Sequence, residues 1–224
     1  MKLFVNGDSH TAQVYPTGIT ATEQVATQLG YDYENIALAG GSNQRIIRTT
    51  QQKLTELDPN NTIIVIGWSS FERTEYYYNH EWHQISGDFV NYSVDDDLDA
   101  LRKERTEPFL NAEGRTFDQH AEQHNQIYVF HQLLNQLGYE HVFYQGCRTH
   151  FFDREPEQTM FRHDWNDCWV HDPYVKKDWT AESFSQYAEK MGCKHADPWD
   201  HYGQDAHDLW AKVLVAKIQQ LKIN

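Results

Sequence analysis

The sequence has few cysteines, and the three that it has are scattered. Cys147, Cys168 and Cys193 are odd in number and lie far apart along the chain. This arrangement fits neither a full set of disulfides nor the paired cysteine spacing of a zinc site. The sequence therefore predicts a protein of a reducing compartment, without a disulfide framework or a metal-binding motif.

A long hydrophobic run is also missing. The longest aliphatic run covers only residues 63–66, far short of the ~20 residues that span a bilayer. The amino terminus carries one lysine and then a three-residue apolar run that ends at Asn6, so no signal-peptide core can be drawn. We expect a soluble, cytoplasmic protein that does not bind a membrane, and a viral origin is compatible with this pattern.

Basic residues are scarce relative to acidic ones. The chain has 19 lysines and arginines against 33 acidic residues, which gives a formal net charge of −14 at pH 7. The electrostatic field of such a molecule repels a phosphate backbone. We therefore expect no nucleic-acid partner.

The apolar residues that are present predict alternating strands and helices. Four short apolar runs, at residues 2–5, 35–39, 62–68 and 141–145, are typical of buried strands. Helical spacing of apolar residues begins after Ser42, recurs in a stretch that ends at Gly138, and returns between Leu209 and Leu221. Strands and helices in this alternating order predict an α/β fold with a parallel sheet covered on both faces.

One domain, residues 1–224, is the expected organisation of a chain of this length. Two polar and aromatic stretches, at about residues 72–106 and 148–179, do not follow the alternating pattern. Both come after the carboxyl ends of predicted strands. We expect them to be insertions at the rim of the sheet, where functional loops usually lie.

The first ten residues place a hydroxyl group at the end of a strand. The apolar residues 3–5 lead into residues 7–10, Gly-Asp-Ser-His. Open α/β folds bind their ligands at the carboxyl ends of the strands. Gly7 permits a sharp turn, Asp8 can fix it, and the Ser9 amide is placed to donate to a developing oxyanion. Ser9 is therefore the first candidate for a nucleophile.

Three further segments complete a pattern that is similar to a known family. They are residues 35–40 (Asn-Ile-Ala-Leu-Ala-Gly), residues 66–70 (Ile-Gly-Trp-Ser-Ser) and residues 197–207, which contain His201. Together with residues 7–10, and in this order, they resemble the four blocks of the SGNH hydrolases, also called GDSL-like esterases and lipases. The resemblance implies a three-layer α/β/α sandwich with a mostly parallel, flavodoxin-like sheet.

The resemblance implies an oxyanion hole, in which two positions stay open. In the second block the family pattern makes the amide of Gly40 a donor, with Gly41 as a rival. In the third block Ser69 stands where the family has an asparagine. Because a hydroxyl is shorter than an asparagine side chain, either Ser69, Ser70 or Arg73 supplies the missing donor, or the activity is weak.

The fourth block implies His201 as the base of a catalytic triad, but the acid is displaced. Pro198 occupies the position three residues before His201, and Asp197 and Asp200 lie on either side of that position. Adjacent extended residues project to opposite sides, so Asp200 is poorly placed to orient its neighbour. We favour Asp197, on a loop one residue longer, with a backbone carbonyl as the third alternative.

The activity implied by the resemblance is acyl transfer without a cofactor. Ser9 attacks an ester carbonyl, His201 takes the hydroxyl proton, and water later releases the acyl group. This chemistry requires no metal and no organic cofactor. The Trp, Tyr and His residues of the two insertions are compatible with a small-molecule or saccharide ester as substrate. The sequence does not indicate the oligomeric state.

Two other interpretations stay open. The replaced asparagine and the displaced aspartate favour a binding or structural module that keeps the fold without the chemistry. The other interpretation is a metal-dependent hydrolase built from a cluster of His and Asp residues. The residues considered for that site are His163, Asp164, His171, Asp172, His195 and Asp197.

Overall fold

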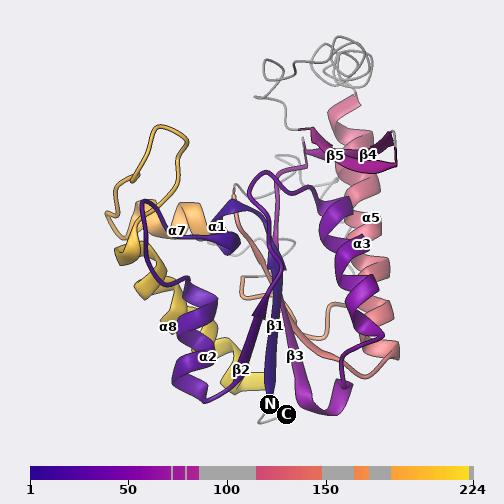
Figure 1. Ribbon diagram of the computed structural model, residues 1–224, viewed down its shortest axis with the longest axis horizontal. Helices are drawn as coiled ribbons and strands as arrows, with labels where there is room; N and C mark the ends of the chain where they lie inside the picture. The colour runs from indigo at the N-terminus through magenta and orange to yellow at the C-terminus, as the bar shows by residue number, and fades with distance from the viewer. Residues whose placement is uncertain (72, 79, 86–114, 148–163, 172–182, 222–224) are drawn as a thin grey trace.

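A parallel sheet of four strands, in the order β2-β1-β3-β6, forms the centre of the molecule. The structure is a computed structural model, which describes residues 1–71, 73–78, 80–85, 115–147, 164–171 and 183–221 (Figure 1). The strands are β1 (Lys2–Gly7), β2 (Asp32–Asn35), β3 (Thr62–Trp68) and β6 (Glu140–Gln145). Each neighbouring pair is parallel, and the order is that of flavodoxin-like folds. The α/β fold class expected from the sequence is confirmed.

Helices cover both faces of this sheet (Figure 1). One face is covered by α2 (Ala21–Leu29), α7 (Phe184–Lys190) and α8 (Gln204–Leu221), and the other by α3 (Asn43–Leu54) and α5 (Arg115–Gln136). Side chains alternate along a strand, so Leu3 and Val5 pack toward α2 and α8 while Phe4 packs toward the opposite layer. No helix within the described parts of the chain is long and apolar enough to cross a bilayer.

The boundaries predicted for the second strand are wrong. The apolar run at residues 35–39 predicts a strand there, whereas β2 ends at Asn35. Among the described strands, β2 pairs only with β1, and none of its residues is fully buried, so it needs no apolar run. The apolar residues follow β2 in an extended segment, in which the amides of Ile36 and Leu38 still donate to carbonyls of β1 at 2.9 and 3.1 Å.

Both segments expected as insertions are described only in part. The first begins with an antiparallel hairpin of β4 (Thr74–Tyr78) and β5 (Glu81–Ile85), which follows β3 and lies beside α3 and α5 (Figure 1). From the second, residues 164–171 run along the edge of β6, where Phe143 forms a parallel bridge with Trp169. Residues 86–106, 148–163 and 172–179 lie outside the described residues.

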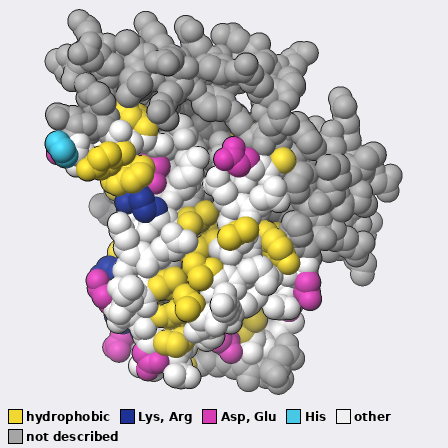
Figure 2. Space-filling view, turned by 90° about the vertical axis from the view of Figure 1, so that its right-hand side faces the viewer, with side chains coloured by type: hydrophobic (Ala, Val, Ile, Leu, Met, Phe, Trp, Pro, Cys, Tyr) yellow, Lys and Arg dark blue, Asp and Glu magenta, His cyan; other side chains and the backbone are white. Residues whose placement is uncertain are grey.

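An apolar groove runs along the face of the molecule that carries α3 and α5. It has a volume of about 740 Å³, and apolar side chains from both helices, such as Ile47, Val129 and Leu133, line it. Figure 2 shows hydrophobic side chains gathered on this face of the molecule. Near this groove, the guanidinium group of Arg48 lies 4.1 Å from the centre of the Trp82 ring of the hairpin.

Candidate active site

The turn after β1 fixes Ser9 at the carboxyl end of the sheet. Asp8 is the N-cap of α1 (Ser9–Ala12), and its carboxylate accepts a hydrogen bond from the His10 amide at 3.1 Å. Ser9 is thus the first residue of the helix, where a backbone amide has no partner within the helix. The residue is only 3% exposed. Figure 1 shows α1 at the end of β1 that is remote from the amino terminus.

The Asp8 side chain is fully buried and connects the ends of three strands. Its Oδ2 accepts a hydrogen bond from the Cys147 thiol at 2.7 Å and lies 3.6 Å from Nη1 of Arg73. A Cβ atom at Gly146 would lie 2.7 Å from Oδ1, so a residue with a side chain would collide with the carboxylate. Burial and the charge of Asp8 raise the pKa of the Cys147 thiol, which keeps the sulfur protonated and able to donate.

Gly40 and Gly41 reach the same end of β1 through the segment that follows β2. The Leu38 amide donates to the carbonyl of Gly7 at 3.1 Å, and the Gly41 amide donates to the carbonyl of Leu38 at 2.9 Å. The latter bond closes a turn in which Gly40, at the third position, has a φ of 73°, as a type II turn requires. Because the turn uses the Gly41 amide, the Gly40 amide is the better placed of the two to face a ligand.

The residue after β3, Ser69, is fully buried and is held from two directions. Asn43, at the start of α3, accepts from the Ser69 amide at 2.8 Å and donates to the Ser69 carbonyl at 3.1 Å. Arg73 donates to Ser69 Oγ at 2.9 Å through Nη1. Since a guanidinium group only donates, this bond uses a lone pair of Oγ and not its proton. Ser70 is half-buried, and its carbonyl accepts from the Arg73 amide at 3.3 Å.

A loop before α8 holds His201 against Asp197. Nδ1 of the ring lies 2.7 Å from Oδ2 of Asp197, and the His201 amide donates to Oδ1 at 3.1 Å. Burial raises the pKa of Asp197, but the hydrogen bonds from His201 and from the Trp199 amide outweigh burial and lower this pKa below its usual value. An ionised carboxylate only accepts, so Nδ1 carries the proton and Nε2 is the basic nitrogen of the ring.

Asp200 serves a different histidine. It has a φ of 62°, and its Oδ1 lies 3.1 Å from Nδ1 of His195. Nε2 of His195 in turn forms a hydrogen bond with the Tyr202 hydroxyl at 2.9 Å. Of the alternatives considered for the acid, the structure brings Asp197 to His201 and places Asp200 against His195.

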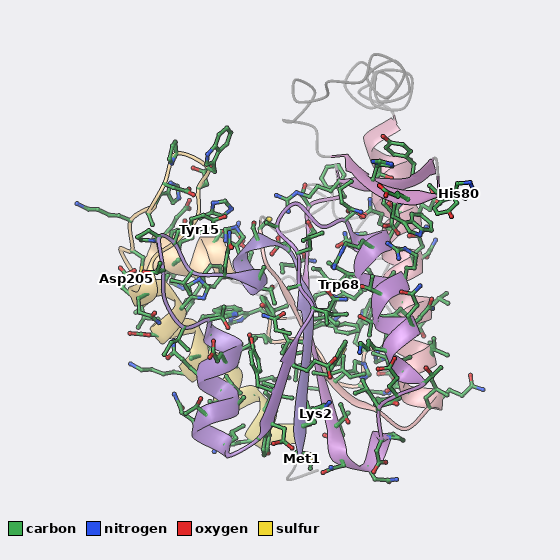
Figure 3. All side chains as sticks on the ribbon, viewed as in Figure 1. Met1, Lys2, Tyr15, Trp68, His80 and Asp205 are labelled. Carbon is green, nitrogen blue, oxygen red and sulfur yellow. The ribbon has the colours of Figure 1, made fainter. Side chains whose placement is uncertain are left out.

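His201 lies against the segment that begins at Ser9. The Tyr15 ring stacks on the His201 ring, with centroids 4.1 Å apart and planes at 7°. The His10 ring, next to Ser9 in the chain, has its centroid 5.6 Å from that of His201. Figure 3 shows Tyr15 at the α1 end of the molecule, remote from Met1 and Lys2. Within the described part of the chain, no hydrogen bond joins Ser9 to His201.

His10 provides an uncharged neighbour for His201. The pKa of His10 is lowered to about 4, mainly by burial; the charge of Asp8 opposes this shift and the nearby His201 adds to it. At neutral pH the His10 ring is therefore neutral. His201 can take up a proton without meeting a second positive charge at this position.

Three residues of the site carry no signal in the sequence. Tyr15, Asn43 and Cys147 touch the proposed machinery through contacts with His201, Ser69 and Asp8. Each pair is separated by at least 26 positions, so no local pattern links its members. An aromatic, an amide or a thiol at such a position looks like an ordinary core residue.

The histidines and aspartates considered for a metal-dependent hydrolase are not brought together in the described chain. His163 and Asp172 lie outside the described residues, and Asp197 and His195 are bound to other partners. Among the described residues, the three side chains that lie within ligand range of one another are His131, His141 and Cys168.

Comparisons with known proteins identify a sequence family and two similar folds. The model of a family of unknown function, DUF6071, matches residues 8–151. No curated protein matches the sequence. The chain is similar to the psychrotrophic esterase EstA from Pseudoalteromonas sp., in a structure inhibited by monoethylphosphonate, with a TM-score of 0.53, 8% identity and coverage of 100% of both chains.

A second similar structure is a catalytic mutant of Axe2, an acetylxylan esterase from Geobacillus stearothermophilus. It has a TM-score of 0.51 and 13% identity, and the match covers 97% of this chain and 93% of that one. At these identities the likeness concerns the fold. The arrangement of sheet and helices is that of the two esterases.

Proposed function

The chain belongs to DUF6071, a family of unknown function, and we propose that this member is a serine ester hydrolase of the SGNH type. The observation that carries the proposal is the His201–Asp197 pair, which packs against the segment that begins at Ser9. An imidazole oriented by a carboxylate, packed against the segment that carries a serine at the end of a parallel strand, supports a serine triad. The fold of the two similar esterases supports the same class of reaction.

In the proposed reaction, His201 removes the proton of Ser9 as Oγ attacks the ester carbonyl. Ionised Asp197 stabilises the imidazolium that forms, and neutral His10 adds no repulsion. The alcohol leaves with the proton from His201, and water then attacks the acyl-Ser9 with His201 again as base. Catalytic hydrogen bonds are often long before substrate binds, so we expect the Ser9–His201 bond to form in the substrate complex.

In this proposal, three groups donate hydrogen bonds to the oxyanion of the tetrahedral intermediate. The first two are the amides of Ser9, at the start of α1, and Gly40, in its turn. The third is the Ser69 hydroxyl, which Arg73 polarises by donating to Oγ. Arg73 thereby takes a supporting role where the family pattern has an asparagine, and the loss of such a donor typically costs ~3 kcal/mol of transition-state stabilisation.

The substrate that we propose is a small or carbohydrate-linked O-acyl ester. The hairpin that follows β3 exposes Tyr77 and Trp82, which are 57% and 46% accessible. Aromatic rings of this kind offer flat apolar faces on which a sugar ring can stack. One of the two similar structures is an acetylxylan esterase, which agrees with this class.

Hydrolysis of p-nitrophenyl acetate by the parent and by Ser9→Ala tests the proposal. Removal of the nucleophile is expected to lower kcat by at least about 10⁴-fold. Ser185→Ala is the matched control, because Ser185 lies at 3.4 Å from Nε2 of His10 but outside the proposed triad. A monoethylphosphonate ester that inactivates the parent and adds mass to the peptide of Ser9 identifies the nucleophile directly.

A binding module that has lost the chemistry is the second candidate function. Two observations favour it: Ser69 stands in place of the asparagine, and no hydrogen bond joins Ser9 to His201 within the described residues. Equal hydrolysis rates for the parent and Ser9→Ala, with no phosphonate adduct, would exclude the esterase and favour the binding module.

A further inference from the structure

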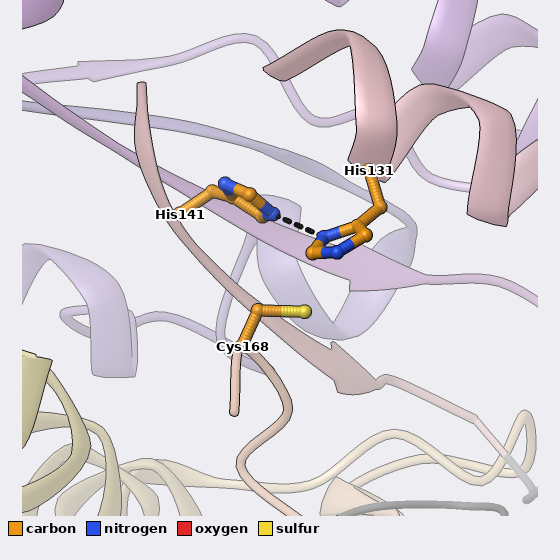
Figure 4. Close-up of side chains that lie close together, drawn as sticks. All are labelled: His131, His141 and Cys168. Atoms are coloured by element: carbon orange, nitrogen blue, oxygen red, sulfur yellow. Dashed lines mark hydrogen bonds between the residues drawn. The ribbon is translucent and has the colours of Figure 1, made fainter. Parts of the chain in front are cut away.

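A second cluster of chemically active side chains lies in the core, apart from Ser9. His131 on α5, His141 on β6 and Cys168 on the segment 164–171 bring their ligand atoms within 4.8 Å of one another (Figure 4). The three residues are 0%, 5% and 2% exposed. They come from three separate elements, so the cluster exists only in the folded protein.

We propose that His131, His141 and Cys168 bind a Zn²⁺ ion through Nδ1, Nε2 and Sγ. Imidazole nitrogens and a thiolate are the ligands that Zn²⁺ prefers in proteins. Nδ1 of His131 and Nε2 of His141 lie 2.7 Å apart, and Sγ of Cys168 lies within 4.8 Å of both. Ligand nitrogens on a tetrahedral ion lie about 3.3 Å apart, so a small separation of the two rings makes room for the metal.

The neighbours of the two rings suit metal ligation. Nδ1 of His141 lies 3.0 Å from the carbonyl of Tyr139, which fixes the proton on Nδ1 and leaves Nε2 with its lone pair. Nε2 of His131 lies 3.0 Å from the side-chain amide of Asn135. An amide can present either its nitrogen or its oxygen. With the oxygen toward His131, it accepts the Nε2 proton and leaves Nδ1 for the ion.

The access route also agrees with a metal site. Cys168 binds as the thiolate and releases its proton to solvent. A cavity of about 340 Å³, lined by His141, Cys168 and Asp167 among others, adjoins the cluster and offers an entry for the ion and a place for water as the fourth ligand.

The role that the position indicates is structural. The Phe143 amide donates to the carbonyl of Cys168 at 2.9 Å, and the Val170 amide donates to the carbonyl of Phe143 at 2.8 Å. An ion held by these ligands therefore fastens the segment 164–171 to β6 and α5. His141 is near the amino end of β6, whereas the candidate active site lies at the carboxyl end of the sheet, so the metal takes no part in ester hydrolysis.

A metal-free cluster is the competing state. Without an ion, Asn135 donates to His131, His131 donates to His141, and His141 donates to Tyr139, so the rings are satisfied by hydrogen bonds alone. The two states differ in a measurable way, because only the metal-bound state has a bond between Cys168 sulfur and an ion.

Metal analysis and Co²⁺ substitution of the full chain test the site. We expect the protein purified from zinc-supplemented cells to hold about one ion per chain. After removal of zinc by a chelator, added Co²⁺ should give the absorption of a thiolate-to-cobalt charge transfer, and zinc should raise Tm. Cys168→Ser should lose the ion and the absorption band. Cys193→Ser, which removes a half-buried thiol outside the cluster, should keep both.

The absorption spectrum of the Co²⁺-treated parent protein tests for metal binding even if Cys168→Ser does not fold. Absence of the charge-transfer band in the parent, or equal metal content in the parent and a folded Cys168→Ser, would overturn the proposal and leave a hydrogen-bonded histidine pair. Either result is independent of the Ser9→Ala assay, because the two sites share no residue.

Discussion

At the residue scale, His201 is oriented from two sides. Oδ2 of Asp197 lies 2.7 Å from Nδ1 of the His201 ring. The Tyr15 ring stacks on one face of the His201 ring, with a centroid distance of 4.1 Å. An imidazole fixed in this way loses little rotational entropy in a proton transfer, which favours the role of base that we propose for His201. Both contacts define the direction in which Nε2 points.

Asp197→Asn is expected to lower kcat/KM for p-nitrophenyl acetate by about 10⁴-fold. An asparagine amide can donate to Nδ1, which favours the tautomer that carries its proton on Nε2 and cannot accept the Ser9 proton. Asp200→Asn is the matched control, because the same change then affects His195 rather than His201. A similar fall of kcat/KM in both variants, measured from initial rates on folded protein, would contradict the role proposed for Asp197.

At the element scale, the start of α3 supports the end of β3. Ser42 caps α3 by accepting from the Arg45 amide at 3.2 Å, and Asn43 then forms two hydrogen bonds with the backbone of Ser69. Both hydrogen bonds are buried, so the backbone amide and carbonyl of Ser69 cannot form hydrogen bonds with water instead. The helix terminus thus fixes the position of a proposed oxyanion donor.

Asn43→Ala is expected to reduce the free energy of unfolding by about 3 kcal/mol, because it leaves two buried backbone groups without this partner. It should also lower kcat, since Ser69 is then less firmly placed. Gln51→Ala, at an exposed position of the same helix, should change the stability by less than about 0.5 kcal/mol. Urea denaturation of the three proteins measures the difference, and equal midpoints for both variants would show that the Asn43 contact contributes nothing.

At the scale of the whole molecule, buried neutral histidines link folding to pH. Burial is the main cause that lowers the pKa values of His10 and His207 from 6.5 to about 4. His207, for example, uses Nδ1 to accept from the Ala21 amide at the start of α2, at 3.2 Å. Over this pH range each of these histidine rings is therefore neutral in the folded chain, whereas the same ring is protonated in the unfolded chain.

The protein is expected to lose stability as the pH falls from 6.5 to about 4, the range over which His10 and His207 differ in protonation between the folded and unfolded states. On acidification these histidines are protonated in the unfolded state at a higher pH than in the folded state, so acid favours unfolding. Each histidine that titrates independently lowers the free energy of unfolding by about 3 kcal/mol over this range. Urea midpoints measured across this range test the effect. His207→Asn keeps an acceptor near the position of Nδ1 but does not titrate, so its midpoint should fall less steeply than that of the parent. Parallel curves for the two proteins would show that His207 is not one of the groups responsible.

The alternation of strands and helices, the caps at Ser42 and Gly138, and the place of Ser9 at the end of β1 were all accessible from the sequence. Each depends on residues that are neighbours in the chain: apolar periodicity, a capping side chain, or a glycine at a turn. The approach of Asp197 to His201 is of the same kind, because the two residues are four positions apart in one loop.

Other features were decided only by the tertiary structure. The stacking of Tyr15 on His201, the burial of Asp8 between Cys147 and Arg73, and the approach of His131 to Cys168 join distant parts of the chain. The position of β2 also belongs here, because an edge strand is held by pairing with β1 rather than by an apolar run of its own. Such contacts depend on how every layer packs against the sheet, and no spacing along the sequence encodes that packing.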